Sequence, residues 1–307
     1  MFKTAYNFST CVLSFSYLIF ILNPIQMASA FVRPFSKSTC RAMNRWCATS
    51  LWSMWVSMAE KSAKIKVRFT GDTVPRGENA ILVCNHQSMA DVMLLLCFAW
   101  RCGRLGDMKF YVKDIIKYFP GVGWGMYFLD MIYVKRNWAK DKGGIKKLFA
   151  KYIDEKIPLF LVSFLEGTRV TPPKLEKAQA FAKERGKYVP QHSLVPRTKG
   201  FVATVAGLGE YVDAVYDITI GYPGGIKSLM DCYLHKVDRV EVHVRRYDAT
   251  EFTNKSEAEL NQWVFDRFQE KDERLAAFQQ TGSFEGEDTY PTIAQDEKYV
   301  VAPMKAS

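Results

Sequence analysis

The chain has 307 residues, of which 48% are hydrophobic and 14% aromatic, so it is long and apolar enough to form a packed core. This composition excludes a chain that is disordered overall. The net charge of +10 suits an anionic partner, either a membrane surface or a nucleic acid. No zinc-finger spacing, RNA-binding motif or basic helical stripe is present, so we expect no nucleic-acid partner.

Residues 1–60 are expected to form a membrane-anchoring leader. No Asp or Glu occurs in the first 58 residues, and no charge interrupts the chain between Lys3 and Arg33. The stretch 11–22 is strongly apolar, but polar residues follow it, and a helix needs about 20 apolar residues to cross a bilayer. A marginal transmembrane helix and a re-entrant or hairpin insertion are therefore both open.

The leader also contains a small-residue motif, Ala28-Ser29-Ala30-Phe31, after its apolar run. This motif is similar to a signal-peptide cleavage site, and it resembles the motif before plastid transit peptides in algae with secondary plastids. A plastid envelope is thus an alternative to the endoplasmic reticulum. Downstream, Trp46, Trp52 and Trp55 predict a helix over 46–58 that lies either at the membrane interface or in an ordinary core.

From residue 64 the pattern alternates between strands and helices. It predicts an α/β domain over 61–282, with a mixed, partly parallel sheet flanked by helices. The tail over 283–307 is acidic and polar, and we expect it to be loose. The expected strands are 80–84, 108–112, 131–135, 158–164, 214–220 and 240–246. The expected helices are 90–100, 115–119, the segment around Ile145 to Tyr152, 175–185, and a long helix from about 256.

The seven cysteines are scattered through the sequence. They form no C-x-x-C pair and show no metal-ligand spacing with the histidines. This pattern predicts reduced, structural thiols that face a reducing compartment. We therefore expect no bound metal.

A candidate base lies at the end of the strand expected over 80–84. His86 follows this strand, and Asp91 comes five residues later, where a turn can bring its carboxylate to one imidazole nitrogen. That bond fixes the tautomer and raises the basicity of the other nitrogen. The plain alternative is a turn histidine beside a helix N-cap aspartate, which the spacing alone favours.

A candidate phosphate clamp follows the apolar run 158–164. In Glu166-Gly167-Thr168-Arg169 the glycine permits a tight turn, and the arginine can hold a phosphate through two parallel hydrogen bonds. The plain alternative is a surface turn with an internal Glu–Arg pair. Lys113 and Arg136 also follow expected strands, although each alone is typical of a solvated charge.

Taken in order, these blocks resemble the glycerolipid acyltransferase family, a PlsC-like family that includes 1-acyl-glycerol-3-phosphate, lysocardiolipin and lysophosphatidylinositol acyltransferases. Its Asn-His-x4-Asp block is similar to 85–91. Its block of an apolar run ending in arginine is similar to 128–136. Its Phe-Pro-Glu-Gly-Thr-Arg block is similar to 164–169, with Leu165 in place of proline. Its proline-centred block, in a eukaryotic lysophosphatidic acid and lysocardiolipin subgroup, is similar to 195–201.

The resemblance implies an acyl-CoA-dependent O-acyltransferase that acylates the free hydroxyl of a lysophospholipid, first of all lysophosphatidic acid to phosphatidic acid. It implies acyl-CoA as co-substrate without a cofactor, and a place on a membrane, first of all the endoplasmic reticulum. His86 would be the base and Asp91 its partner. Lys113, Arg136, Glu166, Gly167, Thr168 and Arg169 would bind the acceptor, and Arg197 and Lys199 would contact CoA or phosphate.

Two alternatives to this function remain open. One is a different acceptor, either lysophosphatidylinositol or monolysocardiolipin. The other is a catalytically silent membrane scaffold, which the presence of both His86 and Asp91 disfavours.

Overall fold

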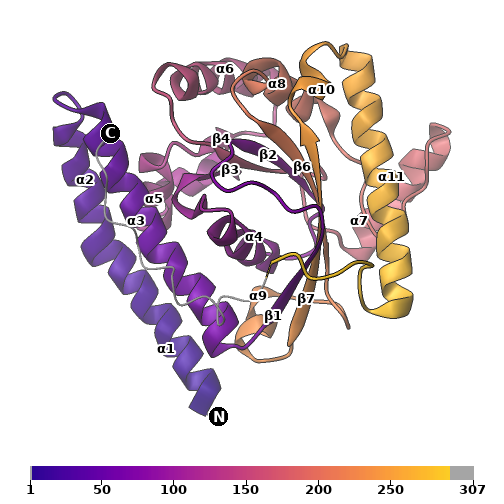
Figure 1. Cartoon of the computed structure of the whole chain (residues 1–307), viewed down its shortest axis with the longest axis horizontal. Coiled ribbons are helices and arrows are strands. Elements are labelled where there is room, and N and C mark those ends of the chain that lie inside the picture. The colour runs from indigo at the N-terminus through magenta and orange to yellow at the C-terminus, as the bar shows by residue number, and fades with distance from the viewer. Residues whose placement is uncertain (1, 291–307) are drawn as a thin grey trace.

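Seven strands form one mixed sheet in the computed structural model, which describes residues 2–290 (Figure 1). The strand order is β1-β7-β6-β2-β5-β3-β4. The five strands from β6 to β4 are parallel, β7 is antiparallel to β6, and β1 pairs in parallel with β7. The strands are β1 (Lys66–Gly71), β2 (Ala80–Cys84), β3 (Met108–Lys113), β4 (Ile132–Val134), β5 (Phe160–Phe164), β6 (Ala214–Gly221) and β7 (Arg239–Asp248).

Helices cover both faces of this sheet. Within β2, Ala80, Leu82 and Cys84 belong to one hydrophobic core, whereas Ile81 and Val83 belong to the other. Every residue of β2 is buried, as expected for a strand in the middle of a parallel sheet with two covered faces. The first face packs against α4 (Ala90–Arg101), α5 (Val122–Phe128) and α9 (Leu229–Tyr233); the second packs against α6 (Trp138–Asp154), α8 (Thr198–Leu208), α10 (Thr250–Thr253) and α11 (Glu257–Thr281).

Local sequence signals set the ends of the longest helix, α11. Ser256 and Glu259 form a capping box, in which each side chain accepts a hydrogen bond from the backbone N–H of the other. Gly282 ends the helix in the left-handed conformation, with φ of 68°. Between them, Val264 and Phe268 face the second core.

The leader forms a helical hairpin. α1 (Phe2–Tyr17), a π-helical segment (Leu18–Leu22) and α2 (Asn23–Val32) follow one another directly, and α3 (Lys37–Ser57) returns alongside α2 (Figure 1). The segment Ser9–Val32 is long and apolar enough to cross a membrane, with a mean hydropathy of 1.6. Its most apolar window is 28% buried inside the protein, so one face of the hairpin belongs to the fold.

The hairpin packs against the rest of the domain and is held together by its own polar contacts. Leu18 and Leu22 belong to the first hydrophobic core, and the Asn44 amide donates to the Ser29 hydroxyl at 2.9 Å. Trp52 is buried while Trp46 is 36% exposed. The helix over 46–58 therefore packs one face into the core and leaves another exposed, and the interfacial location stays a prediction.

The chain after α11 corrects one expectation. Phe284 is buried, Arg68 donates to the Phe284 carbonyl oxygen at 2.9 Å, and the Tyr290 hydroxyl donates to the Val74 carbonyl oxygen at 3.2 Å. Residues 283–290 thus cover the edge strand β1, and the expected loose tail does not begin at 283. The remainder of the expected tail, 291–307, lies outside the described residues.

Candidate active site

The sequence-predicted residues gather at one edge of the sheet. His86 follows β2, Glu166 follows β5, Lys113 ends β3, and Arg136 follows β4. These four strands are parallel neighbours, so their carboxyl ends meet at the same edge, where open α/β sheets hold their sites.

The histidine and aspartate form a hydrogen-bonded pair. His86 Nδ1 lies 2.9 Å from Asp91 Oδ2. A carboxylate only accepts, so the proton of the neutral ring is held on Nδ1, and Nε2 is left as the basic nitrogen. The imidazole stacks on Phe164 with ring centroids 4.1 Å apart and is 12% exposed. The ring is therefore fixed in orientation and open to solvent on a small part of its surface.

Asp91 is fully buried and accepts four hydrogen bonds. Its Oδ2 accepts from His86, from the Gln87 N–H at 2.7 Å and from the Ser88 N–H at 3.0 Å. Its Oδ1 accepts from the Tyr222 hydroxyl at 2.6 Å. Asp91 therefore both closes the turn before α4 and orients the histidine. The alternative of a helix N-cap aspartate describes only the first of these two roles.

Glu166 lies behind the histidine and out of contact with solvent. It is 2% exposed, and its two oxygens accept from the backbone N–H groups of His86 at 3.2 Å and Leu194 at 3.3 Å. Burial raises the pKa of the Glu166 carboxyl well above its usual value, although both N–H groups favour its charged form. In this structure the Glu166 side chain holds two loops together, and its expected contact with the acceptor stays a prediction.

The turn after β5 brings a further arginine to the site. Gly167 has φ of 67°, and a Cβ there would lie 3.3 Å from Cδ and Nε of Arg197, so only glycine lets the arginine lie across this turn. Thr168 accepts a hydrogen bond from Lys174 at 2.7 Å. Lys199, in the first turn of α8, is exposed and forms no hydrogen bond or ion pair through its side chain within residues 2–290.

Three exposed cations surround this edge: Lys113, Arg136 and Arg169. Arg136 has φ of 61°, and its loop is shaped by Asp141, which accepts from the N–H groups of Lys135 and Asn137. Within residues 2–290 none of the three cations forms an ion pair. An anion that entered this edge would therefore not have to displace a carboxylate partner.

A loop from the far side of the domain supports Glu166. Asp272, on α11, accepts from the N–H groups of Gln191, His192 and Ser193, each at 2.8 Å. This clamp fixes the loop that ends at Leu194, the second partner of Glu166. Asp272 is thereby linked to the backbone of His86 through three successive hydrogen bonds: loop to Asp272, Leu194 to Glu166, and His86 to Glu166.

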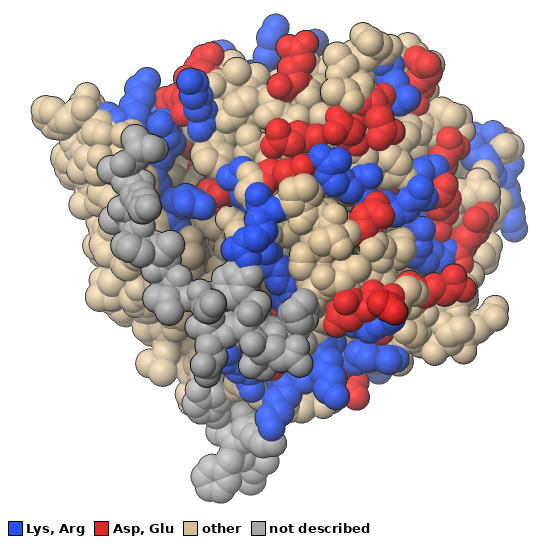
Figure 2. Space-filling model, viewed as in Figure 1, with Lys and Arg blue, Asp and Glu red and all other residues tan. Residues whose placement is uncertain are grey.

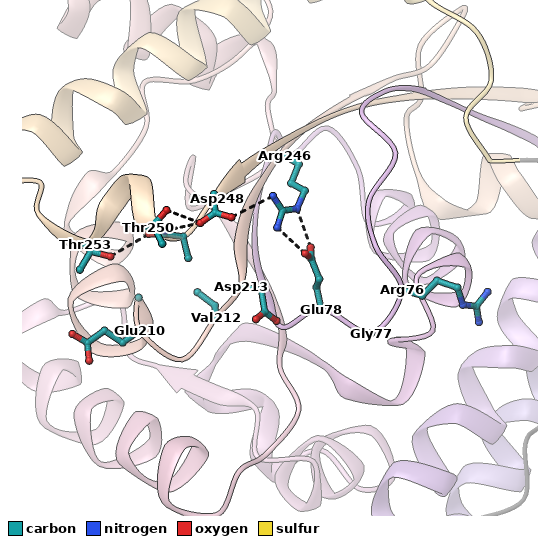
Figure 3. A pocket seen from close by; sticks show the side chains of 12 residues that line it. Arg76, Gly77, Glu78, Glu210, Val212, Asp213, Arg246, Asp248, Thr250 and Thr253 are labelled. Atoms are coloured by element: carbon teal, nitrogen blue, oxygen red, sulfur yellow. Dashed lines mark hydrogen bonds and ion pairs between the residues drawn. The ribbon is translucent and has the colours of Figure 1, made fainter.

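A cavity of about 680 Å³ lies at the opposite edge of the sheet. Figure 3 shows that several of its polar side chains bond to one another: Arg246 pairs with Glu78 at 2.7 Å, and Asp248 accepts from the Thr250 hydroxyl at 2.7 Å. Cavity size alone therefore does not mark the site that the sequence motifs form.

Other groups in the described structure bear on the sequence-based expectations. All seven cysteines are free thiols, and six of them are buried. Within residues 2–290 no group of three His, Cys, Asp or Glu side chains is arranged to hold a metal ion. Sequence reasoning missed Tyr222, Lys174 and Asp272; the first of these follows directly from β6, which pairs with β2, so strand adjacency was the signal.

Comparison with known proteins decides the family. A family model described as "Acyltransferase" matches residues 66–222, just over half of the chain, and one described as "Acyltransferase C-terminus" matches 233–304. This chain belongs to the PlsC-like acyltransferase family. The matched region contains both the histidine–aspartate pair and the turn after β5. Membership identifies the chain as an acyltransferase enzyme, in preference to a silent scaffold or a nucleic-acid binder.

Relatives of this acyltransferase come from plants and animals. It is 33% identical over 264 residues to the probable 1-acyl-sn-glycerol-3-phosphate acyltransferase 5 of Arabidopsis thaliana, covering 86% of this chain and 70% of the relative. It is 31% identical over 276 residues to the human 1-acyl-sn-glycerol-3-phosphate acyltransferase gamma (88% and 73% covered). It is also 31% identical over 273 residues to mouse lysocardiolipin acyltransferase 1 (85% and 72%).

A solved structure supports the fold independently. The crystal structure of the 1-acyl-sn-glycerophosphate acyltransferase PlsC from Thermotoga maritima is similar with a TM-score of 0.52 at 18% identity. The match covers 90% of this chain and 95% of that one. It confirms the α/β architecture expected from the sequence, including the helices flanking a mostly parallel sheet.

Proposed function

We propose that this acyltransferase moves an acyl group from acyl-CoA to the free hydroxyl of a lysophospholipid, with lysophosphatidic acid as the first acceptor and phosphatidic acid as the product. The observation that carries the proposal is the His86–Asp91 pair, with Nε2 left as a base beside cations that have no ion-pair partner among residues 2–290. A base for the hydroxyl and cations for the phosphate are the two groups that such an acceptor requires.

In the proposed reaction His86 Nε2 takes the proton of the acceptor hydroxyl while its oxygen attacks the thioester carbonyl. The tetrahedral intermediate collapses by breaking the C–S bond, and the leaving thiolate takes the proton back from Nε2. Asp91 stabilises the imidazolium that exists between these two transfers. The acyl group passes directly to the acceptor, so no acyl-enzyme forms.

Arg136 and Arg169, with Lys113, hold the acceptor phosphate in this proposal. They reach the edge from three parallel neighbours, so they surround the position that the glycerol hydroxyl occupies before His86. Arg197 lies across Gly167 and adds a fourth cation, for the acceptor phosphate or for CoA. Holding the acceptor in line contributes as much to the rate as the base does.

The hairpin and the segment after β3 place the enzyme on a bilayer in this proposal. Apolar side chains are exposed on both: Phe20 is 72% exposed and Tyr118 67%. The two surfaces adjoin, because a Cβ at Gly121 would lie 2.9 Å from Ile19. Figure 2 shows few charged side chains along the border formed by the hairpin, in contrast to the rest of that face.

This apolar surface supports a membrane location. We expect an endoplasmic reticulum membrane, with a plastid envelope as the alternative. Cleavage after Ala30 would remove α1, the π-helical segment and most of α2, and with them the core residues Leu18 and Leu22, so we expect the leader to be retained. Flotation with phosphatidylcholine vesicles tests the surface: Phe20→Ser combined with Tyr118→Ser reduces binding, whereas Phe181→Ser on α7 (Pro172–Glu184) does not.

The decisive experiment offers labelled oleoyl-CoA to membranes that contain the enzyme, with lysophosphatidic acid, lysophosphatidylinositol or monolysocardiolipin as acceptor. We expect label in phosphatidic acid, and no label on the protein when the acceptor is left out. Label in cardiolipin instead would assign monolysocardiolipin as the acceptor. The similarity to the mouse lysocardiolipin acyltransferase is the reason to include this acceptor. Absence of label in every lipid, with the enzyme folded and membrane-bound, would refute the proposal.

A further inference from the structure

Tyr222 touches the histidine–aspartate pair from a strand that the reaction does not otherwise use. It follows β6, is 4% exposed, and its hydroxyl donates to Asp91 Oδ1 at 2.6 Å. The other carboxylate oxygen, Oδ2, accepts from His86 at 2.9 Å. The three side chains thus form a line in which the aspartate lies between the phenol and the imidazole.

We propose that Tyr222 is a positioning residue that fixes the orientation of Asp91 and shares its negative charge, and thereby sets the basicity of His86. This inference rests on the proposed function for its consequence in catalysis. The hydroxyl is a donor throughout the working pH range, because burial and the charge of Asp91 raise the pKa of Tyr222 well above its usual value.

The negative charge of Asp91 is divided between its two oxygens, one bonded to Tyr222 and the other to His86. A donor on Oδ1 draws electron density away from Oδ2, so the carboxylate holds the protonated imidazole less strongly. Removing that donor concentrates the charge on the bond to His86 and stabilises the imidazolium. The His86 pKa then rises, and a smaller share of the enzyme holds the neutral base at a given pH.

Other titratable groups face this line from neighbouring elements. Glu166 approaches from the turn after β5, Lys271 from α11, Cys84 from β2 and Cys232 from α9. Burial raises the pKa of the Cys232 thiol to about 12 and that of Cys84 further, so both remain neutral near pH 7. A phenylalanine at 222 leaves all four of these groups in place, so an observed change belongs to the lost hydroxyl.

Tyr216, within the strand β6 that Tyr222 follows, offers a matched control. Tyr216 is also buried and its hydroxyl also donates to a carboxylate, that of Glu78, but at the opposite edge of the sheet. Tyr222→Phe and Tyr216→Phe remove the same atom from the same kind of bond. Only the first bond involves the partner of His86.

The test follows the His86 imidazole by NMR in full-length enzyme labelled with ¹³C at histidine, in detergent micelles. Its signal is one of four histidines and is identified by its loss in His86→Ala. In Tyr222→Phe we expect the His86 pKa, and the acidic limb of the pH–rate profile, to move up by about one pH unit. The acceptor KM stays unchanged, and Tyr216→Phe leaves both readings at the wild-type value.

Equal His86 titration in wild type and Tyr222→Phe would overturn the proposal, and so would an equal shift in Tyr216→Phe. Because the titration needs no substrate, it decides the role of Tyr222 even if no lysolipid is acylated, which would refute the proposed function alone. If Tyr222→Phe fails to fold, fluorotyrosine at 222 replaces it. The more acidic phenol is a stronger donor, and it must lower the His86 pKa.

Discussion

The two edges of the sheet carry similar side chains but bond them differently. At the edge that holds the 680 Å³ cavity, Glu78 accepts from Arg246 and from a buried tyrosine of β6, so the charges of this pair are satisfied within the protein. At the carboxyl edge, Asp91 also accepts from a tyrosine, the one that directly follows β6, but its partners include His86, whose second nitrogen stays available. The carboxyl edge is therefore distinguished by a group that keeps a free hydrogen-bonding atom, His86 Nε2, and not by the size of its cavity.

The largest expected effect separates the two carboxylates. Asp91→Asn presents an amide to the Gln87 and Ser88 N–H groups or to Nδ1, which disturbs the tautomer of His86, so we expect kcat to fall by about 10²–10⁴-fold. Glu78→Gln at the other edge should change kcat less than about threefold while lowering the melting temperature. Steady-state kinetics and thermal unfolding of both variants check this. Equal losses of kcat in Asp91→Asn and Glu78→Gln would contradict the distinction between the two edges.

The support behind the carboxyl edge gives the next largest effect. Asp272→Asn replaces an acceptor of three backbone N–H groups by a side chain with two N–H donors, so we expect about 2 kcal/mol less unfolding free energy. The loop at 191–194 then holds Glu166 less firmly, and kcat falls about tenfold. Glu273→Gln, an exposed neighbour on α11, is the control. Destabilisation without any loss of kcat at a temperature where the variant is folded would limit Asp272 to a structural role.

The exposed cations at the carboxyl edge should differ from other surface cations in their effect on acceptor binding. Arg169→Ala removes one donor of the proposed phosphate clamp, so we expect the acceptor KM to rise about tenfold while the acyl-CoA KM stays the same. Lys183→Ala, an exposed charge on α7, should change neither constant. Kinetics with each substrate varied in turn measure this. Unchanged KM and kcat for the acceptor in Arg169→Ala would refute the clamp.

The smallest effect at neutral pH concerns a histidine without a carboxylate partner. Burial, with Arg274, Lys271 and Arg245 nearby, lowers the pKa of His243 from 6.5 to about 4. The unfolded chain binds this proton more tightly, so the free energy of unfolding falls as the pH drops from about 6.5 to about 4.

His243→Gln should flatten that slope while leaving stability near pH 7 almost unchanged. Urea unfolding at several pH values between 4 and 7 measures it, with His192→Gln as the control. An identical slope in His243→Gln and wild type would show that another group causes the acid sensitivity.

The histidine–aspartate pair was predictable because both residues belong to one strand–turn–helix unit, five residues apart. Tyr222 was not, because it lies 131 residues from Asp91 along the chain, and periodicity predicts a strand without its neighbours in the sheet. The support that Glu166 gives to two loops was not predictable for the same reason: its partner Leu194 lies 28 residues away.

The same holds for the fold: elements set by local sequence were predicted, and elements set by contacts far along the chain were not. Strands with continuous apolar runs, such as β2 and β5, appear where the sequence predicts them. The edge strand β1 was not predicted, because its alternation of Lys66, Arg68 and buried residues is short and largely polar. The packing of 283–290 on β1 depends on that strand, so the sequence suggested a loose tail instead.

The central claim is that His86 supplies the base at the carboxyl edge, and the most direct test is the acyl-transfer rate of His86→Ala beside His192→Ala, with the acceptor that the wild type prefers. The account predicts a loss of about 10²–10⁴-fold for His86→Ala, with a melting temperature close to that of the wild type, and a nearly unchanged rate for His192→Ala. A folded His86→Ala enzyme that keeps more than about a tenth of the wild-type rate would contradict it.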